Sequence, residues 1–113
     1  MLLRFVPVLS ALAAIIVGAA SLQAQEIVTF ETTIKGTSFT PAEIKVPANK
    51  PFIIKLTNTN AAPVELESND LKIEKIAAGN SSIIVRVKAQ APGKYLFVDE
   101  FQEDVAKGYV IVE

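Results

Sequence analysis

Residues Phe39 to Asn58 read FTPAEIKVPANKPFIIKLTN. The first part of this stretch, Ala42 to Val46, alternates between apolar and polar side chains, which is typical of a β-strand with one buried face. Pro47 to Lys50 follows as a turn signal, because Pro and Asn favour turns. Pro51 to Asn58 is again short, apolar and β-branched. The stretch therefore predicts two short strands on either side of a turn.

The rest of the chain repeats this pattern of short strands and turn residues. Turn signals return about every 8 to 12 residues, and we find no helix-period segment longer than one turn. This spacing is typical of a β-sandwich. The sequence therefore predicts an all-β sandwich of seven to eight strands. The predicted strands are Ile27 to Thr32, Ala42 to Val46, Pro51 to Asn58, Val64 to Glu67, Leu71 to Ile76, Ser81 to Lys88, Lys94 to Val98 and Gly108 to Val112.

A sandwich of this size needs a core drawn from the inward side chains of both sheets. The predicted core is made of apolar residues at alternate positions of the predicted strands. Its members are Ile44, Val46, Phe52, Ile54, Leu56, Val85, Val87, Tyr95, Phe97, Val110 and Val112.

Composition limits the chemistry that the chain can perform. The 113 residues include no Cys and no His, and the formal net charge is −1. Without Cys there is no disulfide or thiolate chemistry, and without His the usual general base and metal ligand are missing. A nearly neutral charge gives no basic footprint for nucleic acid. We therefore expect one small domain that is a monomer and binds no nucleic acid.

The first 24 residues have the order of a secretory signal peptide. Arg4 supplies a positive charge, residues 5–20 are mostly apolar, and Ala24 offers a small residue before the cleavage point. A membrane anchor is the alternative, but 16 apolar residues fall short of the roughly 20 that span a bilayer. We therefore predict a leader over residues 1–24 and a mature domain over residues 25–113 that is exported to the periplasm.

Removal of the leader also removes Met1, which is the only methionine. The mature domain then has no Cys, His or Met, so any metal that it binds must be held by oxygen atoms. Oxygen ligands favour hard ions such as Fe(III), Ca, Mg or Mn over Cu(I).

Three segments resemble the cupredoxin domains. Phe39 to Phe52 resembles the opening of these domains, in which a Phe-x-Pro-x-x-Ile-x-Val stretch precedes a turn and an apolar strand. Pro92 to Phe97 and Gly108 to Val112 resemble the two strands that flank the cupredoxin ligand loop. The resemblance implies a cupredoxin-like Greek-key β-sandwich over almost all of the mature chain.

The chain departs from this family at the copper ligands. Asp99 stands about where the blue-copper Cys would be, Gln102 near the His and Ala106 near the Met, while the first His would lie near Val64-Glu65. None of the four ligands is present. A type 1 copper site for electron transfer is therefore excluded on chemical grounds.

A narrower resemblance points to iron uptake. Glu65-Leu66-Glu67 followed by Glu74 resembles the cupredoxin-like domains that accompany bacterial iron permeases, of which the EfeO-type domain is one and stand-alone forms are others. This resemblance implies an iron site, with copper as the other candidate metal, and partners that are an inner-membrane iron permease and other periplasmic iron-uptake components. It also implies Glu65, Glu67 and Glu74 as metal ligands. Asp99-Glu100 stands where some members have a Cys, which favours iron over copper.

The distribution of acidic residues agrees in part with a metal site. Most of the 12 acidic residues lie between Glu65 and Glu74 or between Asp99 and Asp104. In a cupredoxin-like sandwich these two stretches converge at one end, where facing carboxylates repel unless a cation lies between them. The alternative is that Glu65 and Glu67 simply face solvent, and that the later acids belong to a solvated loop. The predicted metal ligands are Glu65, Glu67, Glu74, Asp99, Glu100 and Glu103.

Two other functions remain open from the sequence. One is a metal-free exported β-sandwich that binds a protein partner through an edge strand or a loop. The other is a ferroxidase, although one carboxylate cluster without His is little evidence for redox turnover. We favour metal binding and delivery over catalysis.

Overall fold

The computed structural model describes residues 26–113, so the predicted leader lies outside the described residues. No helix in the described part is long and apolar enough to cross a membrane. Residues 26–113 form nine strands and one short 3-10 turn. These are β1 (Thr29–Lys35), β2 (Ser38–Thr40), β3 (Glu43–Val46), β4 (Phe52–Asn58), β5 (Val64–Ser68), β6 (Ile73–Ala77), β7 (Ser81–Val87), β8 (Gly93–Asp99), η1 (Glu100–Gln102) and β9 (Lys107–Val112).

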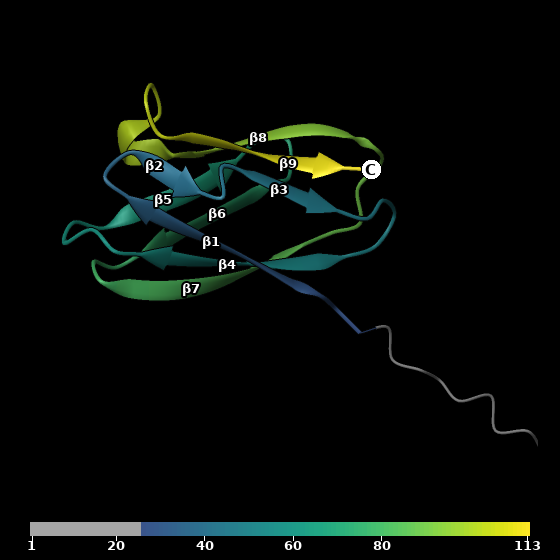
Figure 1. Ribbon diagram of the computed structural model, residues 1–113, viewed down its shortest axis with the longest axis horizontal. Coiled ribbons are helices and arrows are strands. Elements are labelled where there is room, and N and C mark those ends of the chain that lie inside the picture. The colour runs from purple at the N-terminus through teal and green to yellow at the C-terminus, as the bar shows by residue number, and fades with distance from the viewer. Residues whose placement is uncertain (1–25) are drawn as a thin grey trace, which may run out of the picture.

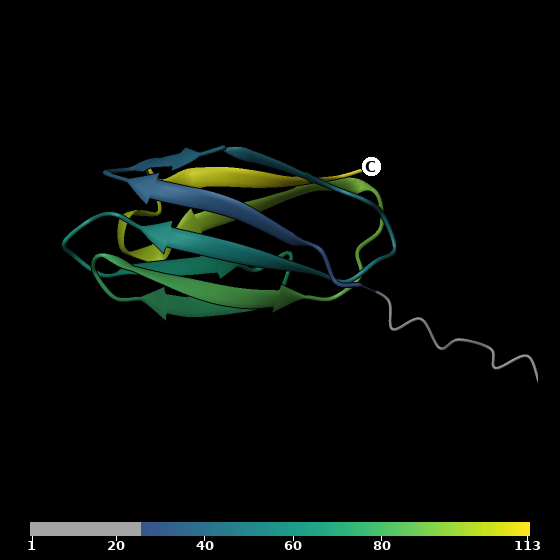
Figure 2. The same cartoon turned by 60° about the horizontal axis from the view of Figure 1, so that its bottom comes forward.

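The strands form two sheets that pack face to face. The first sheet has the order β2-β1-β4-β7 and the second has the order β3-β9-β8-β5-β6. In Figure 1, β8 and β9 lie at the top and β4 and β7 at the bottom, and Figure 2 shows both layers from a second direction. The chain passes repeatedly from one sheet to the other, as Greek-key connections do. The predicted all-β sandwich is confirmed.

The strand count differs from the prediction of seven to eight because of β2. This strand is three residues long and follows a turn in which Gly36 adopts a φ of 59°. Three residues are too few to show an alternating pattern, so β2 could not be recognised. The first strand also extends beyond the predicted Ile27 to Thr32, because its parallel pairing with β4 continues to Ile34.

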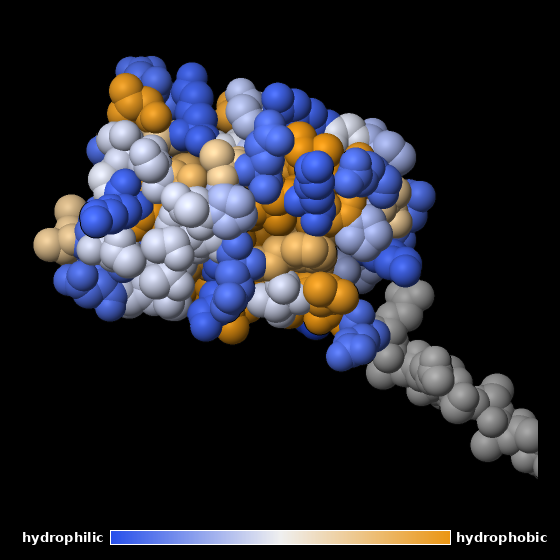
Figure 3. Space-filling view, viewed as in Figure 1, coloured by the Kyte–Doolittle hydropathy of each residue, from blue (hydrophilic) through white to orange (hydrophobic). Residues whose placement is uncertain are grey.

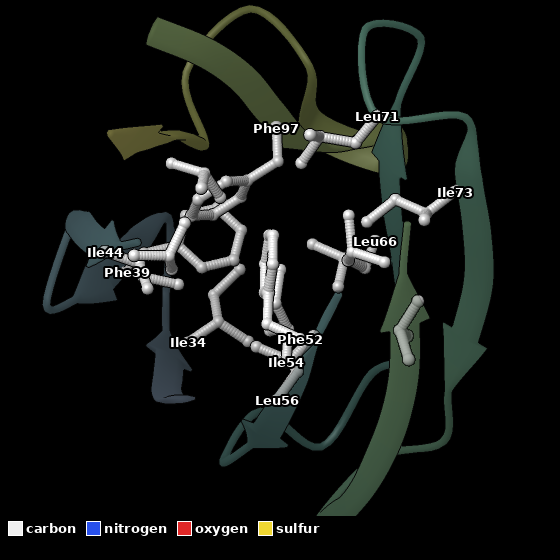
Figure 4. Close-up of a cluster of buried hydrophobic side chains, with 14 of the residues drawn as sticks. Ile34, Phe39, Ile44, Phe52, Ile54, Leu56, Leu66, Leu71, Ile73 and Phe97 are labelled. Atoms are coloured by element: carbon white, nitrogen blue, oxygen red, sulfur yellow. The ribbon is translucent and has the colours of Figure 1, made fainter. Parts of the chain in front are cut away.

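Alternation along each strand delivers apolar side chains to the space between the sheets. Every second residue of β4, from Phe52 through Ile54 to Leu56, is buried. Figure 4 shows these side chains meeting Ile34 and Leu66 from other strands. The predicted core members are all buried except Tyr95, which is half-buried and whose hydroxyl donates a hydrogen bond to the Ala91 carbonyl at 2.7 Å. The core also contains eight residues outside the list of predicted members, namely Ile34, Phe39, Val64, Leu66, Leu71, Ile73, Ala77 and Ala106.

Aromatic packing fixes β8 at the centre of the second sheet. Phe97 contacts Phe39 edge to face, with ring centroids 4.9 Å apart. On the other side Phe97 lies against Gly108 of β9, and a Cβ at that glycine would overlap the Phe97 ring and come within 2.9 Å of the Ala42 carbonyl oxygen. A side chain at position 108 is therefore excluded by close approach. This packing sets the position of the end of β8, where the predicted site begins.

A buried amide links the two loops that flank β5 and β6. The Asn58 side chain is buried and donates to the carbonyls of Ala62, Ala77 and Ala78 at 2.9, 3.3 and 3.1 Å. These acceptors lie just before β5, at the end of β6 and in the following turn. Because a buried amide without partners is costly, Asn58 keeps these three acceptors and so links the segments that carry them. It therefore fixes the two strands that carry Glu65, Glu67 and Glu74.

Candidate metal centre

Strand alternation places the acidic residues of β5 and β6 on the outer face of the second sheet. Val64 and Leu66 of β5 are buried in the core, so the intervening Glu65 side chain faces outward, as does Glu67. On β6 the residue paired with Glu67 is Glu74, which puts both on the same face. The three glutamates predicted from β5 and β6 therefore share one surface.

The turn after β8 brings a fourth carboxylate to this surface. Leu66 pairs with Asp99, the last residue of β8, and η1 then packs beside β5. One carboxylate oxygen from each of Glu65, Glu74 and Glu100 lies within 4.8 Å of the other two. We call these three residues the carboxylate cluster. Glu65 is only 8% exposed, whereas Glu74 and Glu100 are exposed.

Two of the remaining predicted ligands, Glu67 and Glu103, lie beside the carboxylate cluster. Glu67 and Glu103 line a shallow depression of about 270 Å³ together with Glu100, with Leu96 and Val98 as its apolar part. They flank the carboxylate cluster on the same side of the molecule. The structure thus brings Glu67 and Glu103 close to Glu100.

Asp99 lies on the opposite side of the sheet from the outward glutamates. It pairs with the buried Leu66, and it is itself 1% exposed. Its Oδ1 accepts hydrogen bonds from the backbone N–H groups of Glu65 at 3.0 Å and Phe101 at 3.2 Å, and its Oδ2 accepts one from the Gln102 side chain at 2.9 Å. Asp99 is therefore the N-cap of η1. Whether it also binds a metal stays a prediction.

Sequence reasoning did not find the role of Gln102. The sequence places Gln102 only near the position of the blue-copper histidine. In the structure the Gln102 side-chain amide is the third hydrogen-bond donor to Asp99. An available signal was the aspartate itself, because Asp favours the N-cap of a helical turn.

The negative charge of the site has no cationic partner among residues 26–113. The ion pair found in this part of the chain joins Lys55 and Glu31, 3.6 Å apart, on β4 and β1 of the first sheet. Close carboxylates without a counter-charge relieve their repulsion by binding a proton or a cation. The carboxylate cluster is therefore a candidate site for a proton or a cation.

Within the metal-free carboxylate cluster, Glu65 is the carboxyl group whose pKa is raised most clearly. Hydrogen bonding with Glu74, then with Glu100, together with burial and the negative charges of both neighbours, raises the pKa of the Glu65 carboxyl from 4.5 to about 8. The pKa of Glu67 is raised as well, first by burial and then by hydrogen bonding and charge repulsion from Glu100. Near neutral pH, Glu65 therefore holds a proton when no cation is bound.

These shifts predict that the metal-free protein loses stability as the pH rises. The folded state keeps a proton on Glu65 that the unfolded chain releases above about pH 4.5, so the contribution of this proton is complete below that pH and is lost as the pH approaches 8. We expect the melting temperature of the metal-free protein, measured by circular dichroism, to fall between pH 5.5 and 8.5. In Glu65→Gln the fall should be much smaller, and the variant should be the more stable protein at pH 8.5. The matched variant Glu43→Gln, on the exposed face of β3, should keep the wild-type slope. An identical slope in all three proteins would contradict the raised pKa.

The sequence also matches a known family. The family model of the cupredoxin-like domain covers residues 8–112. The chain belongs to the cupredoxin-like domain family. Like other proteins with this fold it is a two-sheet sandwich, but it has no Cys or His, so this cupredoxin-like protein lacks the type 1 copper ligand set.

Relatives of this cupredoxin-like protein include one close enough to align over most of the domain. An uncharacterized protein of Rickettsia prowazekii is 34% identical over 86 residues, which are 76% of this chain and 69% of the relative.

Similar solved structures include the metal-binding domain of the Cu(I)-exporting P-type ATPase CopA of Streptococcus pneumoniae D39 with Cu(I). It is 16% identical with a TM-score of 0.65, covering 76% of this chain and 86% of that one. Reduced auracyanin of Roseiflexus castenholzii is 17% identical with a TM-score of 0.61, covering 78% and 98%. At these identities the likeness shows the fold alone.

Proposed function

We propose that this cupredoxin-like protein is exported to the periplasm, binds iron through the carboxylate cluster of Glu65, Glu74 and Glu100, and passes it to an inner-membrane iron permease. Glu67 and Glu103 flank the cluster and add negative charge that attracts the cation. Copper is the second candidate metal. Delivery to the permease, with other iron-uptake components, is the activity proposed, and ferroxidase turnover is not part of it.

The observation that carries this proposal is the convergence of three carboxylate oxygens within 4.8 Å. Carboxylate oxygens are hard ligands, which suit the small and highly charged Fe(III) ion better than Cu(I). The mature chain offers no sulfur or imidazole that would select copper instead.

The exposure of the cluster supports delivery. Glu65 is buried at the base, while Glu74 and Glu100 reach the surface. A cation bound there keeps an open side toward solvent or toward a partner, so it can be passed on without unfolding of the domain. Export rests on the leader predicted over residues 1–24, and the permease rests on the resemblance of Glu65, Glu67 and Glu74 to iron-uptake domains.

A second candidate function is a metal-free module that binds a protein partner. The observation in its favour is the exposure of two apolar side chains in the connection between β8 and β9, Phe101 at 54% and Val105 at 63%. Figure 3 shows hydrophobic residues beside hydrophilic ones at the end of the molecule where this connection lies in Figure 1. Contiguous exposed apolar groups mark sites of contact with another protein.

Metal titration separates the two functions. We expect the purified protein to bind Fe(III), delivered from its nitrilotriacetate complex, more tightly than Cu(I), when both are measured by competition with chelators of known affinity. Fe(III) binding should weaken as the pH is lowered below 8, because protons compete for Glu65. Equal or tighter binding of Cu(I) would contradict the iron site, and no binding of either ion would favour the metal-free module.

A further inference from the structure

The carboxylate cluster needs an internal restraint, because its members repel one another once Glu65 has lost its proton. Glu65 comes from β5 and Glu100 from η1, two segments that lie far apart in the sequence. Like charges at this separation would push the turn away from the strand unless the backbone were fixed. Glu74 and Glu100 are exposed, so core packing does not hold their side chains in place, and a restraint on the backbone is the effective one.

The Asp99 carboxylate accepts hydrogen bonds both from the strand that carries Glu65 and from the turn that carries Glu100. Through Oδ1 it accepts from the backbone N–H of Glu65 on one side and of Phe101 on the other. Through Oδ2 it accepts from the Gln102 side chain, which belongs to the same turn as Glu100. Charge-assisted hydrogen bonds to a buried carboxylate are stronger than neutral ones.

We infer that Asp99 is a positioning residue of the carboxylate cluster: its buried carboxylate ties the backbone at Glu65 to the turn that carries Glu100 and so holds the metal-binding oxygens together. This inference rests on the proposed function for its effect on metal affinity. Direct ligation by Asp99 is disfavoured, because three of its roughly four acceptor sites are already used. Its side chain also lies on the core side of the sheet, away from the outward Glu65.

Two substitutions separate positioning from ligation. Asp99→Asn and Asp99→Leu remove the same negative charge and give side chains with the same number and branching of heavy atoms. Asparagine keeps an oxygen for the N–H groups of Glu65 and Phe101, and its new NH₂ can donate to Gln102 once that amide turns over. Leucine keeps no acceptor. A difference between the two variants therefore does not come from the lost charge, which both share.

The experiment measures Fe(III) affinity from the nitrilotriacetate complex and, without metal, the pH midpoint of the Glu65 carboxyl by carbon-13 NMR. Asp104→Asn is the charge control in the same connection, and Glu100→Gln is the ligand control. We expect Asp99→Asn to resemble Asp104→Asn in both measurements. We expect Asp99→Leu to bind Fe(III) about 10-fold or more weakly than the wild-type protein. This is the usual loss when a residue that holds a metal ligand in place is removed. The Glu65 midpoint in Asp99→Leu should move back from about 8 toward the ordinary carboxyl range, because the cluster has opened.

Each outcome decides one point. If Asp99→Asn loses as much affinity as Glu100→Gln, Asp99 is a ligand and the inference is wrong, and this comparison stands even where Asp99→Leu does not fold. An unchanged affinity and midpoint in a folded Asp99→Leu would also overturn it. If the wild-type protein does not bind Fe(III), the proposed function fails, while the metal-free midpoint still tests whether Asp99 holds the carboxylates together.

Discussion

Phe97→Ala is expected to lower the free energy of unfolding by about 3–5 kcal/mol, the usual range for removing a large aromatic side chain from a core. Phe97 is 1% exposed and lies between Phe39 and Gly108. Removal of its ring leaves a cavity and breaks the edge-to-face contact with Phe39. The measurement is urea unfolding of the metal-free protein, followed by circular dichroism.

Phe101→Ala is the matched control for this substitution. It removes the same ring from a position that is 54% exposed, four residues further along the chain. We expect a change within about 0.5 kcal/mol, as is usual for a surface site. Equal losses in the two variants would mean that Phe97 does not pack as described.

Iron binding is expected to give the largest functional effect, a rise in melting temperature. A ligand that binds only the folded state stabilises it by about 2.7 kcal/mol at 100 times its dissociation constant. For a domain of this size that corresponds to a rise of about 10–20 °C. Substitution of Glu65, Glu74 or Glu100 by Gln should abolish most of this rise, because one of three close oxygens loses its charge. The melting temperature is measured by scanning calorimetry with and without Fe(III).

Two exposed glutamates outside the carboxylate cluster serve as controls for these variants. Glu31 lies on β1 of the first sheet and Glu43 on β3 at the far edge of the second. Glu31→Gln and Glu43→Gln should keep the full metal-induced rise. Small and equal effects at all five positions would show that the glutamates of β5 and β6 are simply solvated, and the metal site would then be abandoned while the fold stands.

Much of the fold was predictable because strand alternation is a local property. β4 has seven residues with a clean period of two, so both its existence and its buried face could be read from the sequence. β2 has three residues and depends on pairing with β1, which no local pattern reports. Phe39 was missed from the core for the same reason, since its burial follows from that pairing and from its contact with Phe97.

The candidate site was predictable in its residue types but not in its geometry. Alternation put Glu65 and Glu67 on one face, and the fold resemblance brought the segment after β8 close to them. The pairing register that places Glu74 and Glu100 beside Glu65 is a tertiary property. Asp99 and Glu100 are adjacent in sequence and looked equivalent, but the strand ends between them. One side chain therefore turns inward to hydrogen bonds and the other reaches the surface.

Anomalous diffraction at the iron absorption edge, from crystals grown with Fe(III), locates iron in the protein and so shows whether the carboxylate cluster binds it. We expect one strong peak bounded by the carboxylate oxygens of Glu65, Glu74 and Glu100, and no such peak in crystals of Glu65→Gln. A crystal without an iron peak at this position, or with its peak among other residues, would contradict iron binding by the carboxylate cluster.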